Sequence, residues 1–498
     1  MLNMFSTSPE VAGSGFDTAA VALGSVEPKG PHLPVGLDLL LADRFAHDFC
    51  TGKAVYLLPS WPFSMAMETR GFSGAAALNQ QTVWDVLFDI ARILARHRFR
   101  RLLVFDFSNY NWIVKHAVRE INLNEEILQA VWVNPVQFAR EAAGEKMAGD
   151  FGGGAVETSL AEALFPETVR ELPADFDAGV PREYIDYAGL KSVAPAGFWG
   201  RPSAASAEEG RRLYRVMHEK TAEYLDWALN VFPGGRGLES DDRSELWWPE
   251  GSIPGADGPG MDWKNTIAEI SGKRPETAII GTSSTEQHSA SQPVGADYLA
   301  CLEFARGTAD ALGAYLLPAI PVITAWGHIH FRGTMTFSAM AVRRVLLDLA
   351  ASLHAGGFRK IAIINVHGGN WVVKPTIIEI NRTFPDMKVV TTGDILAYRG
   401  QARMEELHAA ESDGSFVKGF YPEAFRDDKV VDFTPKCPAS ALDLVGVAGV
   451  SPKGMWGYQS KSDGEAGRKR VKDRVAAAAA YITEAFAALE DLEGRGGR

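Results

Sequence analysis

Lys360–Asn370 reads KIAIINVHGGN, a near-continuous apolar run of strand length followed by a histidine and two glycines. The preceding stretch, Ser338–His354, has the apolar spacing of an amphipathic helix. Helical segments that alternate with buried strands predict a mostly parallel sheet covered by helices on both faces, an α/β/α sandwich. Functional loops then lie beyond the carboxyl ends of the strands. His367–Asn370 (HGGN) occupies such a position, where glycines let the backbone approach a ligand closely.

The same arrangement occurs twice in the chain. Arg101–Asn122 aligns with Lys360–Asn381, and Gly24–Asp38 (GSVEPKGPHLPVGLD) aligns with Ser283–Asp297 (SSTEQHSASQPVGAD). One constant offset in residue number serves both alignments, which a chance likeness would not maintain over such a length. We therefore interpret the chain as a tandem duplication.

The duplication predicts two domains. At 498 residues the chain exceeds what one hydrophobic core usually serves. We place the first copy at residues 14–233 and the second at residues 273–492. Residues 234–272 contain GGRG and PEGSIPGADGPG, a composition typical of a linker.

Composition excludes several classes of function. With 46% hydrophobic and 22% charged residues, the chain resembles an ordinary globular protein. Its net charge of -12 and the lack of a long basic run argue against nucleic-acid or anionic-membrane partners. The only cysteines, Cys50, Cys301 and Cys437, give no disulfide framework, so a cytoplasmic setting is expected. Neither a secretory signal nor an apolar run of membrane-spanning length is evident in the sequence.

The two copies differ in the residues that could hold a metal ion. The second copy offers a set of carboxylates and imidazoles suited to divalent metal: Glu286, His288, Asp297, His367, His408 and Glu411. The equivalent positions of the first copy are Glu27, Lys29, Asp38, Ser108, Gly152 and Ala155. An ammonium at Lys29 could neutralise Glu27 and Asp38 without any metal. We therefore predict a metal centre in the second copy and a catalytically inactive first copy that serves as a structural partner.

These motifs resemble those of the creatininase (creatinine amidohydrolase) family, over nearly all of both copies. The family signatures are a Glu-x-His-Gly-Pro-His-Leu-Pro...Asp stretch, a His-Gly-Gly-Asn loop and a His-Ala-Gly-Glu-x-Glu-Thr-Ser segment. The first copy keeps Gly30–Pro34 (GPHLP) and Glu157–Ser159 (ETS). The second keeps Glu286–His288, His367–Asn370 and His408–Glu411 (HAAE). The resemblance implies two tandem creatininase-like α/β/α domains and a homo-oligomer, in which a trimer of two-domain chains would mimic a hexamer.

The resemblance also implies two divalent ions per active copy, zinc or manganese. Iron and cobalt accept the same ligands. Carried over residue by residue, one ion would be held by Glu286 and His367, and the other by His288 and Glu411. Asp297 would bridge the two, as an Asp flanked by separate Glu and His ligands can. The role of Glu411 follows the wider family, because this chain lacks the glutamate that creatininase itself has in its His-Gly-Gly loop.

Further residues are expected to act on the substrate. By resemblance, His408 would donate and accept the proton of the leaving nitrogen. His328, in the HIHFRGT segment, would line the substrate pocket beside Trp326. His330 is either a second pocket residue or a surface residue, and Trp326 could equally be a core residue.

Three functions remain open from the sequence. The first is a metal-dependent amidohydrolase, in which a metal-activated hydroxide cleaves a C–N bond other than a peptide bond in a small cyclic amide or formamide. The second is a metal-dependent hydrolase or isomerase of a lactone, cyclic ketone or sugar derivative. The third is a non-enzymatic scaffold descended from such an enzyme. Because Ser289–Pro293 (SASQP) and Asp413–Gly414 depart from the family motifs beside the pocket, creatinine is not assumed as the substrate.

Overall fold

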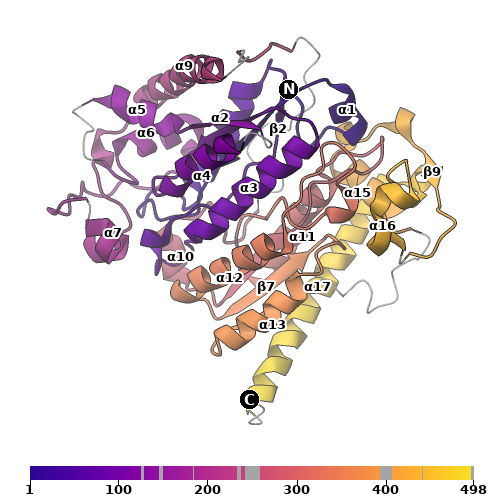
Figure 1. Cartoon of the computed structure of the whole chain (residues 1–498). Helices are drawn as coiled ribbons and strands as arrows, with labels where there is room; N and C mark the ends of the chain where they lie inside the picture. The colour runs from indigo at the N-terminus through magenta and orange to yellow at the C-terminus, as the bar shows by residue number, and fades with distance from the viewer. Residues whose placement is uncertain are drawn as a thin grey trace.

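The structure is a computed structural model of the chain, and it describes residues 1–124, 128–144, 150–182, 184–232, 237–241, 258–392, 406–439 and 441–494. Two four-stranded sheets form its framework (Figure 1). Their strand orders are equivalent, β2-β1-β3-β4 in the first copy and β6-β5-β7-β8 in the second, and every pairing within them is parallel. The predicted α/β class with parallel sheets in both copies is confirmed.

The first copy contains the first sheet and the helices around it. Its strands are β1 (Thr18–Leu23), β2 (Val55–Leu57), β3 (Arg101–Asp106) and β4 (Gln129–Val133). Its helices are α1 (Ser8–Gly13), α2 (Leu37–Cys50), α3 (Gln80–Arg96), α4 (Trp112–Leu123), α5 (Pro135–Ala143), α6 (Ala155–Leu164), α7 (Tyr184–Ala188), α8 (Leu190–Val193) and α9 (Ala207–Val231).

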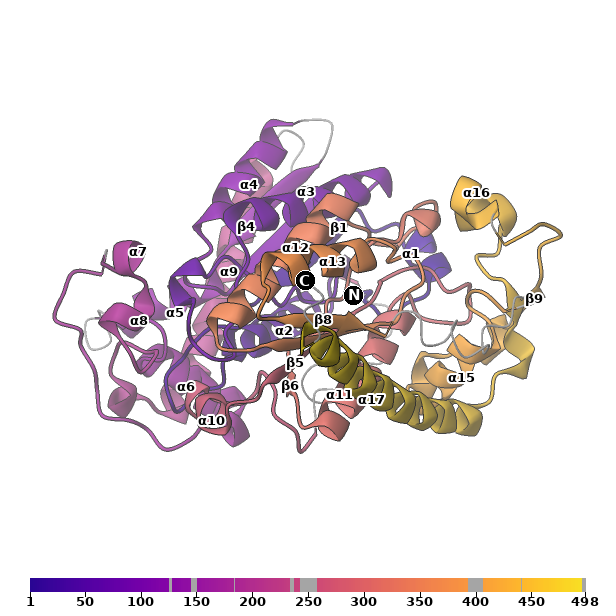
Figure 2. The same cartoon turned by 90° about the horizontal axis from the view of Figure 1, so that it is seen from below.

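The second copy repeats this order. Its sheet strands are β5 (Thr277–Thr282), β6 (Tyr315–Leu316), β7 (Lys360–Asn365) and β8 (Lys388–Thr391), and β9 (Asp432–Phe433) pairs with β10 (Gly457–Tyr458) in a separate antiparallel ladder. Its helices are α10 (Ile267–Lys273), α11 (Ala296–Leu312), α12 (Ala339–Ala355), α13 (Val373–Thr383), α15 (Glu411–Phe420), α16 (Ala441–Val450) and α17 (Gly464–Gly494). Figure 2 shows α12 and α13 on one side of the second sheet and α11 with α17 on the other.

The central strands form where apolar residues follow one another without alternating with polar residues. All six residues of β3 are buried, and so are the four middle residues of β7. A strand covered on both faces needs apolar side chains on both sides, which explains the continuous pattern. Most buried apolar residues of the two copies belong to one connected cluster, so the copies share a single core.

Reciprocal contacts join the two copies. The Tyr56 hydroxyl donates to the Gly333 carbonyl at 2.8 Å, and the equivalent Tyr315 hydroxyl donates to the Gly74 carbonyl at 2.9 Å. Both tyrosines are fully buried, so each hydroxyl depends on its partner in the other copy. The copies therefore contact each other as the halves of an isologous dimer do.

The segments that lead into each copy are exchanged in the same reciprocal manner. The Met4 and Ser6 carbonyls accept hydrogen bonds from the loop before α11 in the second copy. The carbonyls of Trp263 and Asn265 accept the equivalent bonds from the loop before α2 in the first copy. Part of the predicted linker, from residue 261 onward, thus packs against both copies, whereas residues 242–257 lie outside the described residues.

Within the described part of the chain, no helix combines the length and apolarity that crossing a membrane requires.

Candidate metal centre

Loops at the carboxyl ends of three neighbouring strands carry the histidines and carboxylates of the second copy. Glu286 and His288 follow β5, His328 follows β6 in a short 3-10 helix (Trp326–His328), and His367 follows β7. Because the strands are parallel, these loops meet at one edge of the sheet. Asp297 joins them from the first turn of α11, where the helix N-terminus favours a negative charge.

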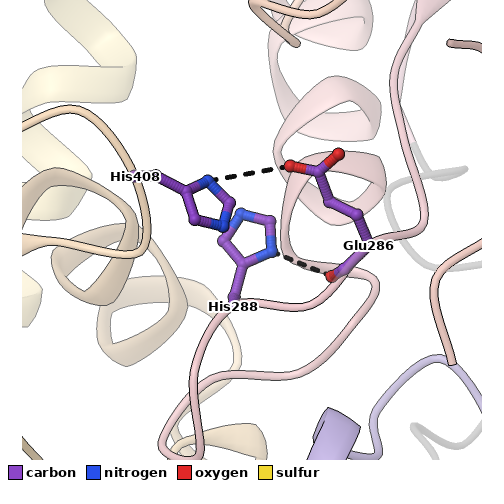
Figure 3. A group of neighbouring side chains, drawn as sticks. All are labelled: Glu286, His288 and His408. Carbon is purple, nitrogen blue, oxygen red and sulfur yellow. Dashed lines mark hydrogen bonds and ion pairs between the residues drawn. The ribbon is translucent and has the colours of Figure 1, made fainter. Parts of the chain in front are cut away.

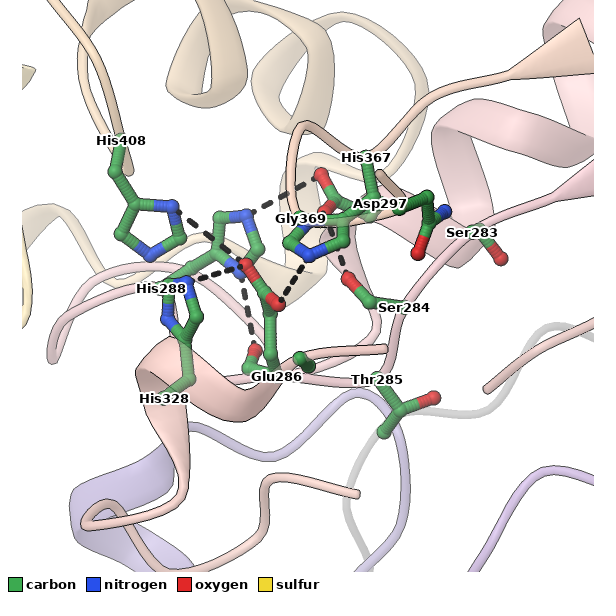
Figure 4. A network of polar contacts seen from close by, with 12 residues as sticks. Ser283, Ser284, Thr285, Glu286, His288, Asp297, His328, His367, Gly369 and His408 are labelled. Carbon is green, nitrogen blue, oxygen red and sulfur yellow. Dashed lines mark hydrogen bonds and ion pairs between the residues drawn. The ribbon is translucent and has the colours of Figure 1, made fainter. Parts of the chain in front are cut away.

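Glu286 lies at the middle of the group and is fully buried (Figures 3 and 4). Its Oε1 is 3.2 Å from His328 Nε2 and 3.7 Å from His408 Nδ1. Its Oε2 is 3.3 Å from His367 Nε2. One carboxylate thus faces imidazoles from three different loops.

Asp297 lies between two further imidazole nitrogens. Its Oδ1 is 3.4 Å from His288 Nε2, and its Oδ2 is 3.2 Å from His367 Nδ1. The Ser284 hydroxyl donates to Oδ2 at 2.8 Å and fixes the carboxylate. Each oxygen of Asp297 therefore faces a different histidine, which places this carboxylate between His288 and His367.

Several buried atoms of this group lack a hydrogen-bond partner. Among the described residues, neither Glu286 oxygen nor His367 Nε2 has one. Their ligand atoms form two sets, within which all atoms lie within 4.8 Å of one another: Glu286 with His288 and His408, and Glu286 with Asp297 and His367. Burying such atoms without a partner is costly, and a divalent cation would satisfy them. The donor set fits a metal ion.

The charges of the group are coupled. Burial opposes ionisation of His288, but the nearby Asp297 carboxylate outweighs it and raises the pKa of the imidazole to about 10. His288 Nδ1 also donates to the Glu286 backbone carbonyl at 3.0 Å, which leaves Nε2 directed at Asp297. Without metal this imidazole therefore carries the proton that a cation would have to displace, so metal affinity should fall as the pH is lowered.

His408 approaches the group from the segment before α15. Its Nε2 donates to the Gln287 backbone carbonyl at 2.8 Å, so Nδ1 is the nitrogen directed at Glu286 (Figure 3). Burial and then the charge of His288 lower the pKa of His408 to about 3. The ring is therefore neutral at pH 7, with a free lone pair on Nδ1.

Gln287 was not singled out from the sequence, although it contacts two histidines. Its side-chain nitrogen lies 3.2 Å from His328 Nδ1 and 3.0 Å from His408 Nε2. In the sequence, only its position between Glu286 and His288 indicates that Gln287 lies near the histidines.

The structure does not bring Glu411, the predicted fifth ligand, to the group. Its carboxylate accepts hydrogen bonds from Arg470 at 2.7 Å and from Ser415 at 2.9 Å. Glu411 begins α15, and residues two apart on a helix point in directions about 200° apart. Asp413 is the acid of α15 that shares the electrostatic environment of the group: burial raises its pKa, the charge of His288 lowers it and that of Asp297 raises it further. The retained acid Glu157 at the equivalent position of the first copy was the missed sequence signal.

We predict opposite effects on metal affinity for substitutions of the two acids on α15. Asp413→Asn should weaken metal binding by about 10- to 100-fold, because it removes a carboxylate charge from the group. Glu411→Gln should leave metal affinity within about twofold, since Glu411 interacts with α17 and not with the histidines. Chelator competition with elemental analysis measures both. Equal losses in the two variants would contradict this assignment.

The predicted pocket residues separate into two kinds. His328 is buried in the group, whereas Trp326 is 53% exposed and donates from its indole nitrogen to the Phe337 carbonyl at 3.1 Å. His330 is exposed, and no hydrogen bond or ion pair joins it to the described residues of the group. His328 ends the 3-10 helix facing inward, while His330 lies beyond it in the following turn.

In the first copy an ammonium group occupies the equivalent place. Lys29 Nζ is 2.7 Å from Glu27, 2.9 Å from Asp38 and 3.3 Å from Glu157, and all four side chains are buried. Burial disfavours the charged lysine, but the carboxylates outweigh it and raise the pKa well above its usual value. Lys29 therefore supplies positive charge at the position that corresponds to the metal centre.

Comparison with known proteins finds one family twice in the chain. The profile of the family described as creatinine amidohydrolase matches residues 5–225 and 261–482. Three curated relatives each align with less than half of the chain. A mycofactocin precursor peptide peptidase of Mycobacterium ulcerans is 27% identical over 227 residues, 43% of this chain and 85% of the relative. A 3-dehydro-scyllo-inosose hydrolase of Thermotoga maritima is 24% identical over 250 residues, 44% and 80% of the two chains. A creatinine amidohydrolase of Pseudomonas putida is 24% identical over 228 residues, 41% and 86%.

Proposed function

The chain belongs to the creatininase family of hydrolases, and on this premise we propose that it is a metal-dependent amidohydrolase. The reaction is hydrolysis of a C–N bond in a small cyclic amide or a formamide, which yields a carboxylic acid and an amine. The observation that carries the proposal is the set of buried, unpartnered ligand atoms on Glu286 and His367. Glu286 Oε2 and His367 Nε2 lie 3.3 Å apart without forming a hydrogen bond, and a cation between such ligand atoms would satisfy both.

We assign metal binding to Glu286, His288, Asp297 and His367, with Asp413 in place of Glu411 as the further carboxylate. When bound, two divalent cations supply Lewis acidity and lower the pKa of water toward neutrality. Zinc and manganese both suit a mixed carboxylate and imidazole set, and iron and cobalt are further candidates.

His408 is proposed to carry the proton between water and the leaving nitrogen. Its neutral ring has Nδ1 directed into the group, while Nε2 is held by the Gln287 carbonyl. Nδ1 can therefore accept a proton as water attacks and return it to the amine as the C–N bond breaks. His408 also belongs with Glu286 and His288 to one of the two candidate ligand groups. The metal content of a His408 variant therefore separates proton transfer from metal binding.

Metal removal tests the proposal directly. The full chain purified without chelator should contain close to two divalent ions and hydrolyse members of a panel of cyclic amides and formamides. Dialysis against a chelator should abolish turnover, and adding back zinc or manganese should restore it. Amine and formate in the product mixture are the expected readout. Substoichiometric metal together with no turnover would instead support the scaffold hypothesis.

A second reaction class is favoured by one comparison. The relative from Thermotoga maritima is named as a hydrolase of an inosose, a cyclic ketone. The same metal-activated water could open such a ring, and product analysis distinguishes the two reactions because ring opening of a ketone releases no nitrogen.

The first copy is proposed to be a permanent structural partner without metal. The reciprocal contacts of Tyr56 and Tyr315 support this role, because each copy completes hydrogen bonds of the other. One chain would then take the place of a dimer of single-domain relatives, and further association, such as a trimer of chains, is a matter for mass measurement in solution.

A further inference from the structure

Two exposed tryptophans stand on the loops that carry the histidines of the metal centre. Trp326 is 53% exposed and begins the 3-10 helix that ends at His328, while Trp371 is 65% exposed and follows the His367–Asn370 loop. The Thr324 hydroxyl donates to the Gly369 carbonyl at 2.7 Å, which holds the two loops side by side. Figure 4 shows His328 and His367 on either side of the Glu286 carboxylate.

Helix α16 adds apolar residues beside these loops. Gly446 lies against the 3-10 helix so closely that a Cβ there would be 2.8 Å from the Gly327 carbonyl oxygen. The two residues before it, Leu444 and Val445, are 84% and 54% exposed. Large exposed apolar side chains that gather at one place commonly mark a binding surface. We call Trp326, Trp371, Leu444 and Val445 the apolar rim.

We propose that the apolar rim selects substrates that carry a large apolar or aromatic group next to the reacting carbonyl. This inference rests on the proposed function, since it names the substrate class of the same site. The metal centre holds the reacting group whatever is attached to it, so selectivity has to come from the surface that the remainder of the substrate touches. A tryptophan face provides a large contact area for an aromatic or branched aliphatic group.

The first copy differs at this surface and provides a matched control. Trp112, 53% exposed, occupies the position of Trp371, but Met67 replaces Trp326. Trp112 follows a loop whose Ser108 and Asn109 contact the Lys29 ion cluster through Glu27 and Glu157. Trp112→Ala therefore removes the same side chain from the same loop position without touching the proposed rim.

The test measures affinity and does not require turnover. Calorimetric titration of the zinc-loaded full chain compares acetohydroxamate with 3-phenylpropionohydroxamate, which bind zinc through the same group and differ in their apolar extension. We expect the phenyl compound to bind about tenfold or more tightly, since burying apolar area of this size is favourable. In Trp371→Ala and in Trp326→Ala the ratio of the two affinities should fall to within about twofold, while Trp112→Ala should keep it.

Every other result contradicts a specific part of the proposal. Equal affinities in the unaltered protein, or an unchanged ratio in both rim variants, would overturn the apolar rim and leave the metal centre intact. Absence of binding by both compounds would overturn the metal centre, and with it the proposed function. A change of molecular mass in solution for Trp371→Ala, with the ratio unchanged, would show that a second copy of the chain covers this surface and not a substrate.

Discussion

Glu286→Gln is expected to abolish turnover and bound metal together, lowering kcat/KM by about a thousandfold or more. Glu286 belongs to both groups of candidate ligands, so its loss affects both proposed ions. Glutamine keeps the volume of the side chain but offers a neutral, weaker ligand. Steady-state kinetics on the best amide substrate, with elemental analysis of the same sample, measures the effect. A variant with full metal content and more than about a tenth of the activity would contradict the assigned role.

The same substitution should not weaken the fold of the metal-free protein. Burial raises the pKa of Glu286 to about 7, so at pH 8 the folded protein carries a buried carboxylate whose ionisation opposes folding. A neutral amide removes that cost. The free energy of unfolding at pH 8, measured with urea in the presence of chelator, should therefore stay equal or increase. The position would then be one where function is maintained at the expense of stability.

Lys29→Met is expected to produce the opposite pattern, a large loss of stability with turnover per folded molecule unchanged. It would leave Glu27, Asp38 and Glu157 as buried carboxylates without the ammonium that contacts all three. Removing one partner of a buried ion cluster costs about 3–5 kcal/mol. Urea unfolding measures this loss, and kinetics normalised to folded protein measures turnover. A loss below about 1 kcal/mol would show that Lys29 is not what holds these carboxylates together.

A smaller side chain at the same position allows a sharper control. Lys29→Ala leaves space among three carboxylates, the type of site that binds a divalent cation. If Lys29 stands in for a metal ion, manganese at about a hundred times its dissociation constant should return about 2.7 kcal/mol of stability to this variant. The Met variant, whose side chain fills the space, should recover much less. Equal recovery in both would indicate metal binding elsewhere.

Much of the fold could be predicted from the sequence. The predicted strand that begins at Lys360 and the predicted helix over Ser338–His354 correspond to β7 and α12, and the aligned stretch Arg101–Asn122 of the first copy begins with β3. These predictions succeed because strands buried on both faces and amphipathic helices have distinct apolar periods. Because the chain is duplicated, helices and strands could be predicted from two aligned stretches of sequence.

The metal centre was predictable in part. His288 and His367 stand out because the first copy has Lys29 and Ser108 at their positions, whereas Glu286 and Asp297 correspond to the retained acids Glu27 and Asp38. Glu411 was chosen on motif alone, and the structure directs it toward Arg470. Glu411 and Asp413 lie two residues apart, so the residue at which their helix begins decides which of them faces inward. Sequence spacing does not reveal where that helix begins.

The sequence by itself determined that the chain holds two α/β copies, that the first copy lacks the histidines of the second copy's ligand set, and that a lysine stands at the position of His288. These conclusions depend on residue types and on the spacing of apolar residues, and both can be recognised in short stretches of sequence. Only the tertiary structure decided that Lys29 reaches three carboxylates, that the charge of Asp413 and not of Glu411 acts on His288, and that the loops before Trp326 and Trp371 are joined by a hydrogen bond. Such contacts join residues far apart in the chain, and their geometry is set by the packing of helices and loops around the shared core.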